Sequence, residues 1–336
     1  MRIEARAPTR IDLAGGTLDI WPLYLFHQPA FTLNCAISLY ASCTLETHKN
    51  TKSIRLISLD TKKREEFSSW RALAESSRYR LPLLAQFAKH FRQPLGLTIT
   101  TDSQAPAGAG ISGSSALAVA LSAAFDRLTH LGGSRVDWIH LSRDIECVVL
   151  GVTTGTQDHY PAAFGGVSLI SFDLGGEHRS ELGADTDELE KRLVLCYTGK
   201  PRRSGINNWK IAKAHIDGDR RVWRNLEEIA QVAREMPASI RAGDWNEAGR
   251  LLREEWNYRR RNLPTISTPT VDRIIARAPK AGALGGKVCG AGGGGCVALL
   301  IEPGARSRVE EAATAAGGQV LPIRIDRHGV RVAAFR

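Results

Sequence analysis

The chain has 336 residues, and its 45 Lys and Arg against 35 Asp and Glu give a formal net charge of +10. Hydrophobic residues make up 43% and charged residues 24%, which is ordinary for a globular protein and excludes wholesale disorder or a fibrous architecture. No apolar run approaches the roughly 20 residues that span a bilayer, and the charged N-terminus, residues 1–10, contains no apolar segment typical of a secretory signal. We therefore expect a cytoplasmic protein with no membrane partner.

The first half of the chain predicts strands accompanied by a few helices. Alternating or β-branched segments indicate strands over residues 2–7, 10–13, 31–46, 53–58, 63–67, 95–101 and 167–172. The spacing of apolar residues indicates helices over residues 81–91 and 116–128, and a third that begins at Ser134 and runs through Val148. Ser134 is expected to cap this third helix, with Asp137 three residues on. A loop is expected over residues 151–158.

The second half predicts several helices and a few short strands. Polar, glycine-containing residues 174–187 mark a shift in composition, so we place a domain boundary there, between residues 1–178 and 179–336. Helices are expected over residues 206–216, 220–235, 245–262, 270–278 and 306–316, with strands after Gly286, over 296–301 and twice at the C-terminus. No internal repeat and no low-complexity tract is visible.

The cysteines and the basic residues limit the function further. The six cysteines are scattered and form no CxxC pair, which favours reduced thiols and disfavours a zinc site. Basic clusters such as residues 220–221 and 259–261 are interpreted as solvated faces, with contacts to anionic substrates or nucleic acid as the alternatives. No zinc finger, RNA-recognition signature or basic stripe with interleaved aromatics is visible, so nucleic acid is not an expected partner.

A glycine-rich loop, residues 106–115, joins a predicted strand to a predicted helix. Its glycines let backbone N–H groups converge without Cβ atoms in the way, and the helix start adds free N–H donors and a favourable dipole. Together these groups predict an anion site sized for phosphate, where Ser114 and Ser115 could contact phosphate oxygens or a magnesium ion. A plain tight turn with Ser114 as the helix cap is the alternative.

Two familiar nucleotide-binding patterns fit this loop poorly. The P-loop pattern GxxxxGK[ST] is absent. The dinucleotide pattern GxGxxG occurs twice, from Gly108 and from Gly290. The acidic residue expected about twenty residues after the first copy falls near Asp126, inside a predicted helix. An NAD(P) oxidoreductase is therefore disfavoured. It stays an alternative hypothesis that rests only on these two GxGxxG matches.

Three further segments contain residues typical of a ligand site. Residues 287–296 contain a longer run of glycines than a hairpin needs, which indicates close approach to a ligand or a flexible turn. Near the N-terminus a strand delivers Arg10, and a glycine turn then presents Thr17 and Asp19, an aspartate that could bind sugar hydroxyls or only its own backbone. Glu146 lies on a predicted helix and Asp158 in the polar loop after it, and each alone would be an ordinary polar residue.

Taken together and in this order, the four segments resemble the GHMP small-molecule kinases, which include galactokinase, homoserine kinase, mevalonate kinase and phosphomevalonate kinase. The family's P-x-R motif and glycine turn match residues 8–19, its nucleotide loop P-x-G-x-G-L-G-S-S matches residues 106–114, and its C-terminal glycine cluster matches residues 290–295. One departure is that Ser112 and Gly113 reverse the family's Gly–Ser order. The resemblance covers essentially the whole chain.

Within the family, the chain is most similar to the sugar 1-kinases, meaning the D-glycero-D-manno-heptose 7-phosphate kinases and the fucokinase domains. The shared features include the turn that ends in Asp19 and the segment from Gln157 through Asp158 to Tyr160. Heptose kinases usually have Gly-Gly-Gly-Thr-Asp at this turn, where the present chain has Gly-Gly-Thr-Leu-Asp. The sequence therefore leaves the sugar itself open.

The resemblance implies a two-layer α+β fold of two domains, with an N-terminal domain like ribosomal protein S5, a ferredoxin-like C-terminal domain with extra helices, and the active site between them. It also implies ATP and Mg²⁺ as cofactors. The residues expected to hold the nucleotide are Pro106, Gly108, Ala109, Gly110, Ile111, Ser112, Gly113, Ser114 and Ser115. Ser114 and Glu146 are the expected metal ligands, since Mg²⁺ prefers hard oxygen donors.

The implied reaction is transfer of the γ-phosphate of ATP to a hydroxyl, expected to be the anomeric one, of a sugar or sugar phosphate. Asp158 is the expected base, and Arg10 is expected to steady Asp158 or the γ-phosphate. The residues expected to bind the acceptor are Gly16, Thr17, Asp19, Gly292, Gly293 and, for a phosphate on the acceptor, Arg203, for which a basic surface loop is the alternative. A kinase of galactose, fucose or mevalonate and a catalytically silent sensor of sugar and ATP are the rival hypotheses. A monomer and a homodimer are equally compatible with the sequence.

Overall fold

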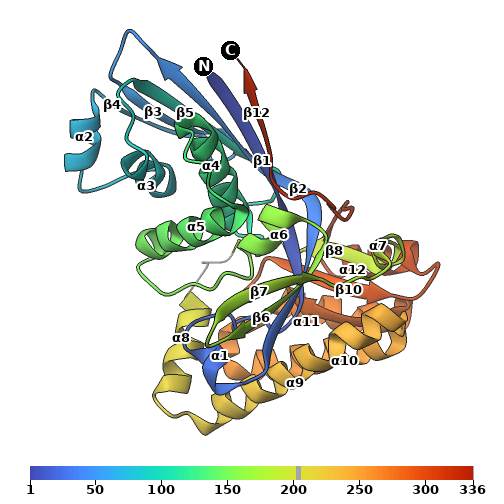
Figure 1. Ribbon diagram of the computed structural model, residues 1–336. Coiled ribbons are helices and arrows are strands. Elements are labelled where there is room, and N and C mark those ends of the chain that lie inside the picture. Colours follow the sequence, from blue (N-terminus) through green and yellow to red (C-terminus); the bar gives the residue numbers. More distant parts are fainter. Residues whose placement is uncertain (202–205, 336) are drawn as a thin grey trace.

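The structure, a computed structural model, describes residues 1–201 and 206–335 and contains two β-sheets with helices packed on them (Figure 1). Among these residues the larger sheet has eight strands: β1 (Arg2–Ala14), β2 (Ala30–His48), β3 (Ile54–Ser58), β4 (Lys63–Phe67), β5 (Gly96–Ser103), β6 (Val167–Asp173), β7 (Gly176–Glu181) and β12 (Arg331–Phe335). Their order is β12-β1-β2-β5-β3-β4, and β6 pairs with both β2 and β7. The long strand β2 holds this sheet together, because its first half pairs with β6 and its second half with β5.

Helices pack on the larger sheet and direct two polar side chains toward each other. α4 (Gly113–Thr129) lies on β1 and β2, against α3 (Pro82–His90), α5 (Arg135–Leu150) and α6 (His159–Phe164), and α2 (Trp70–Glu75) packs on α3. The alanines of α4 allow the neighbouring helices and strands to approach closely, so most of this helix is buried. Ser134 and Asp137 form the predicted cap of α5, each side chain bonding the other's backbone N–H. This packing brings Ser114 of α4 next to Glu146 of α5.

The smaller sheet is antiparallel, in the order β11 (Gln319–Leu321), β8 (Leu193–Tyr197), β10 (Cys296–Ile301) and β9 (Ala283–Val288). The helices of this half are α7 (Thr186–Arg192), α8 (Ile206–Ile216), α9 (Arg220–Ala242), α10 (Trp245–Asn262), α11 (Pro269–Arg277) and α12 (Arg306–Ala315), with 3-10 turns at Pro264–Ile266 and Ala278–Ala281. The short helix α1 (Leu23–Phe26) follows β1. α10 packs on β9 and on α9, and α9 reaches β2, so this helix pair connects the two sheets (Figure 1).

The predicted α+β architecture is confirmed, with several differences in detail, among them the short helices α1 and α2, which the sequence did not indicate. The two N-terminal strands are one strand, β1, and residues 159–164 form α6. The sequence did not indicate β7, α7 and β8, which lie in and after the polar segment. α9 continues past Glu235 to Ala242 with Pro237 inside it, because its apolar face stays buried there.

The division of the chain between residues 178 and 179 stays a prediction. It falls inside β7, and β12 from the second segment returns to pair with β1 of the first. A chain cut at this point would therefore separate paired strands. None of the helices in the two described ranges is long and apolar enough to cross a bilayer.

A buried group of charged side chains joins the two sheets. Asp12 of β1 accepts a hydrogen bond from Lys287 Nζ of β9 at 2.6 Å. Lys287 also lies 3.5 Å from Glu255 of α10, whose Oε1 accepts hydrogen bonds from Arg259 at 2.9 and 2.5 Å. All four side chains are almost fully buried. Burial alone would raise the pKa of Asp12, but the attraction of Lys287 and of two arginines outweighs it and holds that pKa well below its ordinary value.

The contact between Asp12 and Lys287 is expected to be essential for stability. Lys287→Met leaves the Asp12 charge buried without its closest cation, and breaking a buried ion pair in this way typically costs about 3–5 kcal/mol. The free energy of unfolding, measured by urea denaturation, should fall by that amount. Lys191→Met at an exposed position is the control and should change it by less than about 0.5 kcal/mol. Equal unfolding free energies for Lys287→Met and the wild type would contradict this role.

Candidate active site

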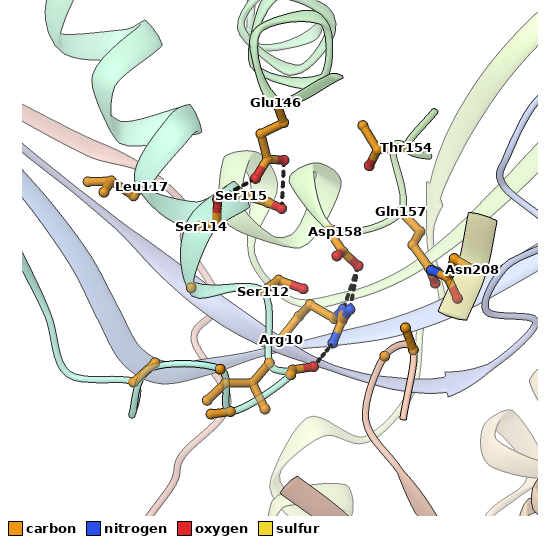
Figure 2. A pocket seen from close by; sticks show the side chains of 18 of the residues that line it. Arg10, Ser112, Ser114, Ser115, Leu117, Glu146, Thr154, Gln157, Asp158 and Asn208 are labelled. Atoms are coloured by element: carbon orange, nitrogen blue, oxygen red, sulfur yellow. Dashed lines mark hydrogen bonds and ion pairs between the residues drawn. The ribbon is translucent and has the colours of Figure 1, made fainter. Parts of the chain in front are cut away.

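A cavity of about 330 Å³ lies between the start of α4, the loop before α6 and the turn after β9. Its volume suits a small ligand. Its walls contain all nine residues predicted to hold the nucleotide, together with Arg10, Gly16, Thr17, Glu146 and Asp158. Figure 2 shows Ser114 and Ser115 beneath Glu146 on one side, with Arg10 and Asp158 nearby. The structure thus gathers in one place residues that are far apart in the chain.

The predicted phosphate loop leads from β5 into the N-terminus of α4. Ser112 has a left-handed backbone with φ +64°, whereas Gly113 is the first residue of α4, where a Cβ atom would meet nothing closer than 3.5 Å. The reversed Ser112–Gly113 order therefore puts the serine at the position that favours glycine, at a cost of about 1–2 kcal/mol. The hydroxyl of Ser112 is buried and has no hydrogen-bond partner among the described residues.

Contacts from both sheets hold the loop in place. Arg10 of β1 donates from its backbone N–H to Ile111 O at 3.1 Å and from Nη1 to Gly110 O at 3.0 Å. From the other sheet, Cys296 N donates to Ala109 O at 2.7 Å. The glycine cluster before Cys296 thus ends directly against the phosphate loop.

Arg10 and Asp158 form an ion pair at the edge of the cavity. Arg10 Nε and Nη2 donate to Asp158 Oδ1 at 2.8 and 2.5 Å, so Oδ2 receives neither bond. Arg10 is buried, whereas the Asp158 side chain is 29% exposed. Burial opposes the charge of Arg10, but the attraction of Asp158 and Asp12 outweighs it and raises the pKa of Arg10 above its ordinary value. The arginine therefore stays charged and fixes the direction of the carboxylate.

Ser114, Ser115 and Glu146 form a second polar group beside the phosphate loop. Ser114 Oγ donates to Glu146 Oε1 at 2.5 Å, and Ser115 Oγ donates to Oε2 at 2.9 Å. His159 Nε2 lies 2.7 Å from the same Oε2. Burial opposes protonation of His159, but the contact with Glu146 outweighs it, so the pKa of His159 is raised. Glu146 is thus a buried, held carboxylate, and the exposed Ser114 hydroxyl lies beside it at the cavity.

The residues predicted to bind the acceptor lie in different places. Gly16 and Thr17 line the cavity, and Thr17 Oγ1 donates to Asn208 Oδ1 at 3.1 Å. Asp19 is not among the lining residues. Its two carboxylate oxygens accept hydrogen bonds from the backbone N and from Nε2 of Gln157, both at 3.1 Å. Asp19 therefore lies behind the wall that Gln157 forms.

The other residues predicted to bind the acceptor are Gly292, Gly293 and Arg203, and the two glycines are not among the described residues that line the cavity. Gly292 packs against Ile266, and Gly293 N donates to Ile266 O at 2.8 Å. The glycine cluster meets the cavity through Gly290 and Ala291 instead. Arg203 lies outside the described residues. Contacts of these three residues with a substrate stay predictions.

Sequence reasoning gave no role to several polar side chains of the cavity wall, among them Gln157, Asn208 and Arg259. Arg259 belongs to a cluster interpreted as solvated, yet it is buried and donates from Nη2 to Gly16 O at 2.8 Å. A signal was available, because Leu252 and Trp256 precede it at helical spacing on the apolar face of α10. Asn208 carried no comparable signal.

Comparison with known proteins identifies the family. The model of the GHMP kinases N terminal domain matches residues 80–166, and that of the GHMP kinases C terminal matches residues 236–319. A mevalonate kinase from Thermococcus onnurineus is 31% identical over 254 residues, which cover 70% of this chain and 69% of that protein. The chain belongs to the GHMP kinase family.

Two further proteins resemble this GHMP kinase over nearly its whole length. A D-glycero-alpha-D-manno-heptose 7-phosphate kinase from Campylobacter jejuni is 29% identical over 338 residues, or 98% of each chain. A crystal structure of a D-glycero-D-manno-heptose 1-phosphate kinase from Bacteroides thetaiotaomicron has a TM-score of 0.77 and 26% identity, with 99% of each chain covered. The predicted activity class is confirmed: this GHMP kinase transfers a phosphoryl group from ATP to an alcohol group. The oxidoreductase hypothesis is therefore wrong.

The buried Asp19 makes the stability of this GHMP kinase depend on pH. Burial, with a smaller contribution from Asp158, raises the pKa of Asp19 to about 7 from 3.8. Between about pH 4 and 7 the folded protein therefore keeps a proton that the unfolded chain loses, so this contribution to stability is full below pH 4 and is lost as pH rises through 7.

Asp19→Asn removes this titration and should change the pH dependence accordingly. The difference in unfolding free energy, variant minus wild type, should increase from pH 4 to pH 8 by an amount on the order of a few kcal/mol. Urea denaturation at pH 4.5, 6 and 7.5 measures it. A difference between the two proteins that does not change with pH would contradict the assignment.

Proposed function

We propose that this GHMP kinase phosphorylates a sugar phosphate of the heptose class and that the anomeric hydroxyl is the acceptor. The ion pair between Arg10 and Asp158 carries the proposal, because it places an oriented carboxylate in the same cavity as a phosphate-binding loop. Similarity to a heptose 7-phosphate kinase over 98% of both chains supports the substrate class. The polar wall of Thr17, Gln157 and Asn208 suits an acceptor with several hydroxyls.

The proposed mechanism assigns positioning to the protein, since phosphoryl transfer depends mainly on alignment and on compensation of charge. The loop at the start of α4 presents backbone N–H groups and the positive end of the helix dipole to the phosphates. Asp158 orients the acceptor hydroxyl and takes its proton through Oδ2, the oxygen that receives no bond from Arg10. Arg10 holds Asp158 in place and adds positive charge beside the reacting groups.

The residues also fit a magnesium ion held jointly by the protein and the nucleotide. Ser114 and Glu146 offer adjacent hard oxygen donors next to the phosphate loop. Among residues 1–201 and 206–335, no group of three or more His, Cys, Asp or Glu could hold a metal by itself. Mg²⁺ is commonly bound by one or two protein ligands together with substrate phosphates. When bound, it compensates the charge of the β- and γ-phosphates.

The function is tested by ADP release with ATP and Mg²⁺ over a panel of heptose 7-phosphate, heptose 1-phosphate, fucose, galactose, mannose and mevalonate. Asp158→Asn should lower kcat by about 10²–10⁴-fold on the accepted sugar, because it removes the proton acceptor. Asp187→Asn, at an exposed position, is the control and should keep the wild-type rate.

The site of phosphorylation follows from NMR of the product, where coupling of phosphorus to the anomeric proton is expected. Turnover of mevalonate alone would contradict the sugar assignment. A wild-type rate in Asp158→Asn would contradict the role of the carboxylate, and sugar and ATP binding without ADP release would favour the sensor hypothesis.

The metal ligands are tested by titration with Mg²⁺. Glu146→Gln should raise the Mg²⁺ concentration needed for half-maximal activity by about tenfold or more, because it removes the charged oxygen ligand. Ser114→Ala should have a smaller effect in the same direction. Glu311→Gln, an exposed glutamate of α12, is the control. An unchanged Mg²⁺ dependence in Glu146→Gln would contradict the assignment.

A further inference from the structure

The loop between α5 and α6 fixes the side chain of Gln157 in one orientation. Its backbone N and its Nε2 donate to the two oxygens of the Asp19 carboxylate, both at 3.1 Å. Gly155 permits this approach, since a Cβ atom there would lie 1.8 Å from Asp19 Oδ2. Because Nε2 is committed to Asp19, the amide of Gln157 presents its oxygen in the remaining direction.

The oxygen of this amide has no hydrogen-bond partner within residues 1–201 and 206–335. Gln157 is only 5% exposed, and its Oε1 has no hydrogen-bond donor among the described residues. A buried acceptor without a donor is costly, by about 1–3 kcal/mol. Gln157 nevertheless lines the cavity, immediately before Asp158 in the chain (Figure 2). The missing donor can therefore come from a molecule in the cavity.

The chemistry of the donor follows from the surroundings. Ionised phosphate oxygens carry no hydrogen and cannot donate, so the phosphates do not supply the missing donor. A hydroxyl can donate to Oε1, and Thr17 and Asn208 are further polar groups of the same cavity. We propose that Gln157 Oε1 accepts a hydrogen bond from a second hydroxyl of the acceptor, next to the hydroxyl that Asp158 orients. Asp19 is then a positioning residue, which acts on the acceptor through Gln157.

This inference rests on the proposed function and makes Gln157 a determinant of specificity for a polyhydroxyl acceptor. A site that hydrogen-bonds a hydroxyl discriminates strongly against an analogue without it, because the protein group is then left unpaired. Removing the amide should abolish that discrimination, whereas general damage to the fold would leave the ratio between the two substrates unchanged.

The test compares the wild type, Gln157→Met and the control Gln231→Met, an exposed glutamine of α9. Each protein is assayed with the acceptor sugar and with its monodeoxy analogues. In the wild type, removal of the hydroxyl next to the reacting one should lower kcat/KM by about 10–100-fold. In Gln157→Met the KM for the sugar should rise by a similar factor, the KM for ATP should stay unchanged, and the penalty for that analogue should fall below about threefold. Gln231→Met should behave as the wild type.

Calorimetric binding of the sugar without ATP separates this inference from the proposed function. Weaker binding by Gln157→Met than by the wild type is expected. A wild type that binds the sugar phosphate but does not phosphorylate it contradicts the proposed function, whereas equal binding by the two proteins contradicts the role of Gln157. A wild type that binds none of the sugars contradicts both, and an unchanged penalty for every deoxy analogue in Gln157→Met also overturns the inference. Asp19→Asn should reproduce the rise in the acceptor KM.

Discussion

The carboxylate of Asp12 is the contact on which the arrangement of the two sheets and the active site depends. Its oxygens accept hydrogen bonds from Lys287 of β9 and from the backbone N–H of Gly290, at 2.6 and 2.8 Å, and Arg10 lies 3.5 Å away. A charge that is buried this completely is tolerated only when cations and N–H donors surround it. The strand that carries Arg10 and the turn that carries the glycine cluster are therefore held in one relative position.

Opposite charges alternate from the core to the cavity and fix the orientation of the groups proposed to take part in the reaction. Glu255 lies beside Lys287, Lys287 beside Asp12, Asp12 beside Arg10, and Arg10 beside Asp158. Only the last of these groups is appreciably exposed. Dipoles and charges that are already oriented need no rearrangement when phosphoryl transfer begins, which is the main electrostatic advantage of an enzyme over water. In the proposed mechanism, the energetic cost of burying these charges is thus linked to catalysis.

Local sequence patterns predicted many of the helices and strands, but they did not predict which polar side chains are buried. The glycine-rich turn before α4, the cap at Ser134 and the helical run of α4 depend on residues close in sequence, and the structure has all three. The buried roles of Arg259 and Gln157 depend on partners more than a hundred residues away, so composition alone assigned the first to solvent and gave no role to the second. Asp19 shows the same limit: the sequence placed it near the site, but only the fold shows that Gln157 lies in front of it.

The reversed order of Ser112 and Gly113 shows why the loop keeps its shape despite an unfavourable residue. Ser112 carries the strain of a left-handed backbone and a buried hydroxyl without a hydrogen-bond partner in the described part of the chain, both of which a glycine would avoid. The neighbouring carbonyls are nevertheless fixed from two directions, by Arg10 at Gly110 and by Cys296 N at Ala109. Because these anchors come from different sheets, the conformation of the loop is set by tertiary contacts and not by the local preference of residue 112. The serine at this strained position is therefore tolerated because contacts from both sheets hold the neighbouring carbonyls.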